Sequence, residues 1–176
     1  YEKLQLLRTH GITKDPDQLQ ENHGGWYYEM QELGFNYRIS DINCALGLSQ
    51  LKRAADRLER RKTIAKRYDE AFEDTPIRPL VKPFDGGHAY HLYVIQTAER
   101  RQLYDQLRSS GVYAQVHYIP VHLQPYYQRL GWRKGDLPMA EQYYEQCLSL
   151  PMYPELSRAD QMKVIELTKS SILCEH

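Results

Sequence analysis

The stretch ELGFNYRISDINCALGLSQLKR, residues 32–53, joins a loop of unusual composition to the start of a helix. Its GFNYR loop (residues 34–38) places a glycine, two aromatic residues, an asparagine and an arginine together, without helical or strand periodicity. Ser40 then offers a hydroxyl oxygen to the free amides of a helix start, and Asp41 suits the positive end of the helix dipole. Such a loop is either a structural hinge or one wall of a binding site.

The residues that follow predict one long helix over residues 41–74. Apolar or small residues recur from Cys44 to Phe72 at mostly alternating spacings of four and three. A helix of about 30 residues spans roughly 45 Å, which exceeds one small domain, so we expect it to link two bodies. Its outer face is rich in Lys, Arg, Asp and Glu and is expected to be solvated. A coiled-coil dimer is the alternative, although Arg61 interrupts the apolar stripe.

The rest of the chain predicts a small α/β body behind a Pro- and Gly-rich connector, residues 74–87. Residues 1–10 read as the end of a helix and residues 11–35 as a loop. Beyond the connector we expect strands over residues 88–96 and 112–118, a helix between a Thr97 cap and Gly111, a helix over residues 137–150, and a last helix capped by Ser157.

Composition excludes several classes of protein. The 176 residues are 41% hydrophobic and 26% charged, as in globular proteins, and no apolar run is long enough to cross a membrane. A formal net charge of zero gives no general attraction to nucleic acid or to anionic lipid. The three cysteines, Cys44, Cys147 and Cys174, lie far apart, which argues against a disulfide framework and fits the reducing cytoplasm.

The seven histidines do not predict a metal site. His88 and His91 are three residues apart on an expected strand, so their side chains point to opposite faces. A turn could bring His117 and His122 together, but no carboxylate or thiolate follows nearby in the sequence to complete a site.

The GFNYR loop has the chemistry of an anion-binding corner. Gly34 can adopt a backbone shape closed to other residues. Asn36 brings two amide donors and Arg38 a fork suited to phosphate or carboxylate, just before a helix start that also favours anions. The alternative is structural, with Arg38 pairing Glu29 or Glu32 of its own chain.

A second cluster, QVHYIPVHLQPYY (residues 115–127), sets His117, Tyr118 and His122 around a proline just past an expected strand. Residues in such positions are often presented by a rigid scaffold for binding, although these aromatic residues could also cap a core.

The segment LGFNYRISDINCALGLSQLKR resembles the signature of the DegT family of sugar-nucleotide aminotransferases, which use pyridoxal 5'-phosphate and have the aspartate-aminotransferase-like fold type I. The segments RRKTIAKRYDEAF, HLYVIQ and VHYIPVH continue the resemblance in order along the chain. Within the family, WYYEMQELGFNYRISD and VHYIPVHLQPYYQRLGW are most similar to members of the pseudaminic acid pathway. Those members aminate C4 of a UDP-linked 4-keto-6-deoxy-N-acetylhexosamine, with glutamate as donor.

The resemblance implies three parts. Residues 1–40 would be the end of the large cofactor domain with an active-site loop, residues 41–74 the long linking helix, and residues 75–176 the small C-terminal α/β domain. It also implies a homodimer in which this loop reaches the neighbouring subunit's site. There Asn36 would donate to the cofactor phosphate. The substrate-binding residues would be Tyr37, Arg38, His117, Tyr118 and His122.

The chain starts at Tyr1 in an uncapped helix, so we expect the protein to continue upstream. In the family the Schiff-base lysine and the acid that holds the pyridine nitrogen lie upstream, and no lysine here lies in the corresponding motif. We therefore expect no catalytic residue within this chain, and neither tight cofactor binding nor transamination by this chain alone. The rival hypothesis is a non-catalytic α/β module for ligand binding or dimerisation.

Overall fold

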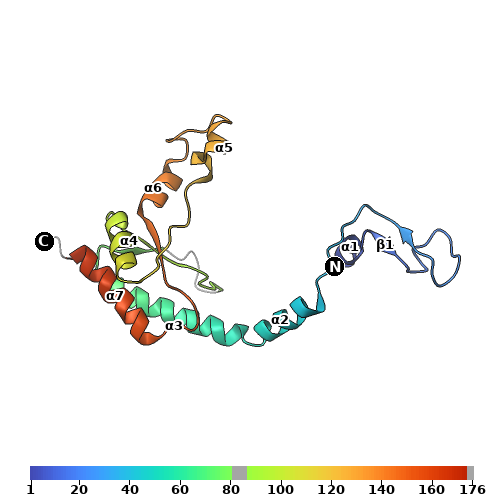
Figure 1. Ribbon diagram of the computed structural model, residues 1–176, viewed down its shortest axis with the longest axis horizontal. Coiled ribbons are helices and arrows are strands. Elements are labelled where there is room, and N and C mark those ends of the chain that lie inside the picture. Colours follow the sequence, from blue (N-terminus) through green and yellow to red (C-terminus); the bar gives the residue numbers. More distant parts are fainter. Residues whose placement is uncertain (81–86, 174–176) are drawn as a thin grey trace. The chain divides into compact units, whose positions relative to one another are not determined.

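The computed structural model describes residues 1–80 and 87–173 and divides the chain into two compact units (Figure 1). Unit 1 is Tyr1–Arg53 and unit 2 is Ala54–His176. The chain is mixed α/β, as predicted. No helix in the described part of the chain is long and apolar enough to span a membrane.

Unit 1 contains two helices and a small β-ribbon, which are α1 (Glu2–Leu7), β1 (Ile12–Thr13), β2 (Glu29–Met30) and α2 (Asp41–Leu51). The ribbon is antiparallel, with Ile12 opposite Met30, and lies inside the segment predicted to be loop. The predicted cap is confirmed, because the Ser40 hydroxyl accepts the Asn43 N–H at 3.3 Å.

The elements of unit 2 are α3 (Ala54–Phe72), β3 (Arg78–Pro79), β4 (Tyr93–Gln96), α4 (Arg100–Ser109), the 3-10 turn η1 (Val121–Leu123), α5 (Pro125–Gln128), α6 (Pro138–Gln146), β5 (Cys147–Leu150) and α7 (Arg158–Leu173). The three strands form an antiparallel sheet in the order β3-β4-β5. Helix α7 packs against α3 and α4, while α3 contacts β3 and α4 contacts β5 (Figure 1).

The core of unit 2 lies between these helices and the sheet. The Tyr68 ring of α3 stacks on Tyr93 of β4 with centroids 4.7 Å apart, and its hydroxyl donates to the Pro151 carbonyl. Fully burying an aliphatic side chain contributes about 1.5 to 3 kcal/mol. Other core residues include Ile64, Phe72, Ile95, Leu103, Leu107, Leu148, Leu156, Val164 and Ile165.

The single helix predicted over residues 41–74 is wrong, because the structure has two helices in its place. α2 ends at Leu51 and α3 begins at Ala54. The Arg53 N–H bonds the Gln50 carbonyl, three residues back, which tightens the last turn and ends the helical ladder.

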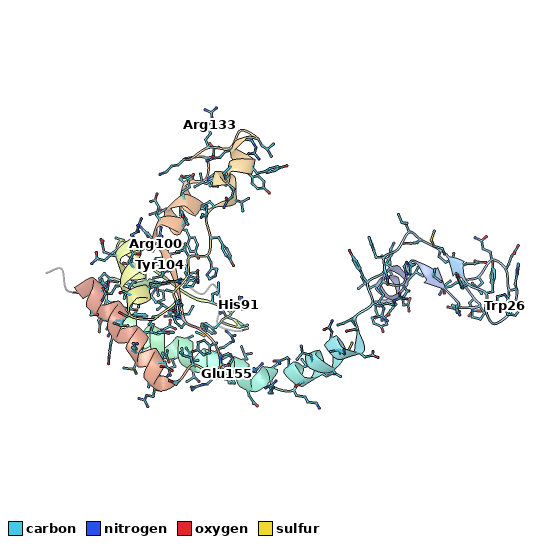
Figure 2. All side chains as sticks on the ribbon, viewed as in Figure 1. Trp26, His91, Arg100, Tyr104, Arg133 and Glu155 are labelled. Atoms are coloured by element: carbon cyan, nitrogen blue, oxygen red, sulfur yellow. The ribbon has the colours of Figure 1, made fainter. Side chains whose placement is uncertain are left out.

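The charged face of α3 is not simply solvated, contrary to the prediction. Arg61 donates through Nη1 to the carbonyl oxygens of Tyr90 at 2.9 Å and Met152 at 3.1 Å. Arg60 bonds two carbonyls in the loop of residues 151–156. Two further arginines of α3 also have partners, Arg57 on Glu155 (labelled in Figure 2) and Arg67 on the Gln161 side chain.

Three predicted boundaries in unit 2 also change. The helix expected to reach residue 150 stops at Gln146, because residues 147–150 are buried on both faces as strand β5. The strand expected over residues 112–118 is reduced to one bridge, between Gln115 and Ser149. The strand expected over residues 88–96 is formed only over Tyr93–Gln96.

Local signals predicted other boundaries correctly. Ser157 caps α7, accepting the Asp160 N–H at 3.0 Å. Gly111, at φ +77°, follows the end of α4. By contrast, the predicted cap at Thr97 is wrong, because α4 begins at Arg100 with Glu99 in the N-cap position, and Thr97 accepts only the Glu99 N–H in the preceding turn. Part of the predicted connector, together with Lys82 and Cys174, lies outside the described residues.

Candidate functional site

Backbone hydrogen bonds clamp the GFNYR loop onto the segment that leaves α1. The Phe35 N–H donates to the Leu7 carbonyl at 2.6 Å, and the His10 N–H donates to the Phe35 carbonyl at 2.8 Å. The Tyr37 N–H donates to the Arg8 carbonyl at 2.9 Å. Because the main chain makes these contacts, the loop is held in place without using its own side chains.

Two glycines allow this close approach. A Cβ on Gly34 would lie 2.2 Å from the Gly11 nitrogen and 2.5 Å from the His10 carbonyl carbon. A Cβ on Gly11, which has φ +70°, would lie 1.8 Å from the Glu32 oxygen. The two backbones can therefore meet only if neither position carries a side chain. Glycine is needed at position 34 because a side chain would not fit there. The sequence had suggested a different reason, an unusual backbone conformation.

The side chains of the GFNYR loop point away from this clamp. Tyr37 is 74% exposed and its ring stacks on Phe35 with centroids 5.0 Å apart. Asn36 and Arg38 are also exposed, and neither side chain has a hydrogen-bond or ionic partner among residues 1–80 and 87–173. An exposed guanidinium and an exposed amide beside a fixed backbone leave donors available for an anionic ligand.

The two acids considered as partners of Arg38 are engaged elsewhere. Glu32 pairs with Lys3 at 3.3 Å. Glu29 accepts the backbone N–H groups of Gln20 and Glu21 at 2.8 and 3.0 Å. In the described part of the chain, Arg38 therefore pairs with neither Glu29 nor Glu32.

Glu29 organises the loop between β1 and β2, which sequence reasoning missed. Besides the two N–H groups, its carboxylate accepts the Tyr27 hydroxyl at 2.9 Å and the Gln31 amide at 3.0 Å. The hydrogen bond from the Gln20 N–H, helped by the other donors, holds the pKa of the Glu29 carboxyl below its usual value. No sequence motif predicts this role, because the two backbone donors lie nine and eight residues away in the sequence and are brought to Glu29 by the fold.

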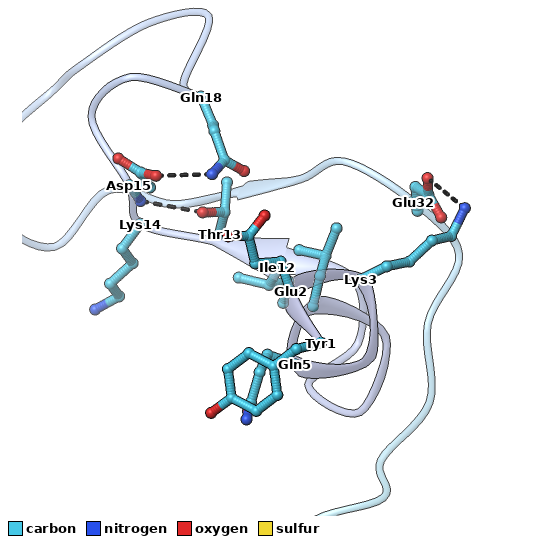
Figure 3. Close-up of a pocket in the computed structure, with 11 residues that line it drawn as sticks. Tyr1, Glu2, Lys3, Gln5, Ile12, Thr13, Lys14, Asp15, Gln18 and Glu32 are labelled. Carbon is cyan, nitrogen blue, oxygen red and sulfur yellow. Dashed lines mark hydrogen bonds and ion pairs between the residues drawn. The ribbon is translucent and has the colours of Figure 1, made fainter.

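A pocket of about 500 Å³ lies in unit 1 between α1 and β1 (Figure 3). The Gln18 amide donates to Asp15 at 2.7 Å along one edge, and the Lys3–Glu32 ion pair lies at another. The predicted ligand-binding side chains of the GFNYR loop are not among the residues that line it.

In unit 2, residues 117–124 carry three side chains that the sequence predicts to bind substrate, and this segment is called the substrate loop. At its start, His117 Nδ1 lies 2.8 Å from the Ser149 hydroxyl of β5. Tyr118 is 73% exposed and meets the His117 ring edge to face. The loop therefore presents Tyr118 from a position fixed by the sheet.

At the other end of the substrate loop, His122 is only 5% exposed. Its Nε2 lies 2.8 Å from Glu141 Oε1 of α6, and the Gly135 N–H donates to the same oxygen at 2.7 Å. The hydrogen bond from His122 is the main cause that lowers the pKa of the Glu141 carboxyl. An ionised carboxylate only accepts, so His122 donates from Nε2.

The structure thus gives the predicted site residues different surroundings. Asn36, Tyr37 and Arg38 lie together in unit 1 with free side chains. His117 and Tyr118 lie together in unit 2, whereas His122 is buried against a partner of its own chain. Ser149 and Glu141 were missed, because a lone serine on a strand and a lone glutamate on a helix carry no local signal. No cluster of three potential metal ligands occurs in the described ranges.

Comparisons with known proteins agree on one family. The model of the DegT/DnrJ/EryC1/StrS aminotransferase family matches residues 1–169. The chain is 39% identical over 182 residues to the spore coat polysaccharide biosynthesis protein SpsC of Bacillus subtilis, covering 97% of the chain and 46% of SpsC. It is 36% identical to a UDP-4-amino-4,6-dideoxy-N-acetyl-β-L-altrosamine transaminase of Campylobacter jejuni, covering 98% of the chain and 45% of that protein. The chain therefore spans about half the length of these relatives.

A solved structure gives the same fold. The putative sugar aminotransferase Spr1654 of Streptococcus pneumoniae superposes with a TM-score of 0.84 and 30% identity, covering 99% of this chain and 43% of Spr1654. That structure is the PMP form, and a PLP form of the same protein matches with a TM-score of 0.83.

Proposed function

Because the chain belongs to the DegT/DnrJ/EryC1/StrS aminotransferase family, we propose that it is the C-terminal part of a pyridoxal-phosphate-dependent transaminase. The complete enzyme moves an amino group from glutamate to C4 of a UDP-linked 4-keto-6-deoxy-N-acetylhexosamine, in pseudaminic acid or related glycan synthesis. The transaminase name of the C. jejuni relative supports this substrate class.

The observation that carries the proposal is the GFNYR loop, with its clamped backbone and free Asn36 and Arg38 side chains. The Asn36 amide donates to the phosphate of the cofactor, for which a neutral amide on a fixed backbone is suitable. Arg38 binds the nucleotide-sugar phosphate or the donor carboxylate, and Tyr37 lines the same pocket. When bound, pyridoxal phosphate supplies an electron sink for the substrate carbon.

The described lysines of this chain do not fit the role of Schiff-base residue, which needs a desolvated amine. None of the eight lysines among the described residues is buried, since Lys169 is half-buried and the others are exposed. Four of them, Lys3, Lys62, Lys66 and Lys134, also pair with acids. We therefore propose that the Schiff-base lysine belongs to a part of the enzyme outside this chain, and that the chain alone does not transaminate.

The site is shared between two subunits of a homodimer. Support comes from α2, none of whose eleven residues, all described in the structure, is buried. Ile42 is 82% and Leu51 71% exposed, and α2 continues directly from the exposed aromatic residues of the GFNYR loop. A second copy that covers α2 would receive the loop into its own site.

The test uses the complete enzyme, with bound cofactor measured by its visible absorbance after gel filtration. Replacing Asn36 by Ala removes a hydrogen bond to a charged group, worth about 1.5 to 3 kcal/mol. We expect roughly ten- to hundredfold weaker cofactor binding. The matched control is Asn22→Ala, an exposed asparagine of unit 1 that lies outside α2, which should retain cofactor normally. If Asn36→Ala retains cofactor as well as the wild type does, the GFNYR loop is a structural hinge and not part of the cofactor site.

The exposed apolar surface of α2 also favours a second candidate function, a non-catalytic dimerisation module. This function predicts that the complete protein dimerises, shows no cofactor absorbance with pyridoxal phosphate and shows no spectral change on adding glutamate.

A further inference from the structure

We propose that Glu141 is a positioning residue that acts through His122 to hold the substrate loop against the nucleotide sugar. This inference rests on the proposed function and deepens it, by assigning the sugar portion of the substrate to residues 117–124.

Glu141 connects three segments that are separate in the sequence. Its Oε1 accepts from His122 of η1 and from the Gly135 N–H of the turn before α6, while Glu141 itself belongs to α6. Both His122 and Glu141 are buried, with 5% and 7% exposed. A buried acceptor with two donors fixes their positions, and removing it leaves both donors unsatisfied.

The substrate loop is thereby held at both ends. Ser149 of β5 fixes His117 at the start, and Glu141 fixes His122 at the end. Tyr118 lies between these anchors with 73% of its surface exposed. The loop is thus a short bridge that offers the exposed Tyr118 and Gln124 side chains, together with His117 Nε2, which has no hydrogen-bond partner among residues 1–80 and 87–173. The His122 ring is occupied by its hydrogen bond to Glu141 and does not contact substrate.

The chemistry of this bridge suits a sugar better than the amino donor. Its eight residues, HYIPVHLQ, contain no lysine or arginine. The carboxylates of glutamate need cationic partners, and in this chain Arg38 of the GFNYR loop offers one. An aromatic face with a hydroxyl and an imidazole suits the ring and hydroxyl groups of a neutral hexose. The substrate loop is therefore assigned to the sugar portion of the substrate.

The test compares Glu141→Ala, Glu141→Gln and the control Glu145→Ala in the complete enzyme. Glu145 lies on the same helix, and its carboxylate is exposed beside Lys134. We expect Glu141→Ala to raise KM for the nucleotide sugar about 10- to 100-fold, because the loop loses its end support. The half-reaction with glutamate, followed by cofactor absorbance, should change less than about threefold. Glu141→Gln keeps an acceptor oxygen and should restore KM.

The amide exchange of Gly135 reports the support independently of activity. It should accelerate in Glu141→Ala and stay near wild type in Glu141→Gln and Glu145→Ala. An unchanged sugar KM in Glu141→Ala, or equal loss in both half-reactions without rescue by Gln, overturns the inference while the wild type still transaminates. A wild-type enzyme that aminates no nucleotide sugar overturns the proposed function and the sugar assignment together. In that case the amide exchange of Gly135 still shows whether Glu141 holds the turn before α6.

Discussion

The contact between Gly11 and Gly34 makes the sharpest prediction about the fold. In Gly34→Ala, the new methyl group would lie 2.2 Å from the Gly11 nitrogen, 2.5 Å from the His10 carbonyl carbon and 2.8 Å from the Leu7 carbonyl oxygen. All three are backbone atoms, so no flexible side chain can move aside. The two segments must separate, and the three hydrogen bonds of the clamp are lost or lengthened.

The magnitude follows from those three bonds. Each contributes about 0.5 to 1.5 kcal/mol net, so opening the clamp should become easier by about 1.5 to 4.5 kcal/mol. That corresponds to amide exchange about tenfold to a thousandfold faster at the His10, Phe35 and Tyr37 amides. The measurement is hydrogen exchange by NMR, which resolves unit 1 from unit 2.

Gly47→Ala is the matched control. Gly47 lies within α2, and a methyl group at this position would meet no atom within 4 Å apart from its chain neighbours and the backbone of its own helix, so alanine should stabilise the helix by about 0.5 to 1 kcal/mol. Wild-type exchange at the clamp amides in Gly34→Ala would refute the claim that close backbone packing holds the GFNYR loop.

Two other predictions concern charged groups. The pKa of Glu29 is lowered in the folded chain, so its contribution is present above the unfolded value, about 4.3, and is lost as pH falls through the lower folded value. NMR shifts of the Gln20 and Glu21 amides should titrate below that pH, and a midpoint at or above it would contradict the role of Glu29. Arg61→Met should destabilise unit 2 by about 1 to 3 kcal/mol in urea titrations followed by NMR, because two part-buried carbonyls lose their donor. Lys66→Met, which breaks an exposed pair, should cost less than about 0.5 kcal/mol, and equal effects would refute the argument.

Features that depend on a few neighbouring residues could be predicted from the sequence. The caps at Ser40 and Ser157 and the stop at Gly111 each depend on bonds within one turn. That Asn36 and Arg38 bind an anion stays a prediction, which rests on residue type in an exposed loop.

Features that depend on distant contacts could not be predicted. Arg61 looked solvated because its carbonyl partners lie 29 and 91 residues away in the sequence. Residues 147–150 looked helical because a short apolar run fits a helix or a buried strand equally well, and only pairing with β4 decides. The burial of His122 against Glu141 could not be predicted, because nothing in the sequence indicates that the two residues face each other.

The meeting of Gly11 and Gly34 also separates two parts of unit 1. Residues 12–33 leave and return at almost the same point, as a closed excursion whose far end carries the exposed Trp26 (Figure 2). Lengthening a closed loop costs little entropy, since each doubling costs only about 0.6 kcal/mol. The excursion can therefore grow, shrink or change its residues while the GFNYR loop stays in register, which makes residues 12–33 an exchangeable insert beside a fixed site.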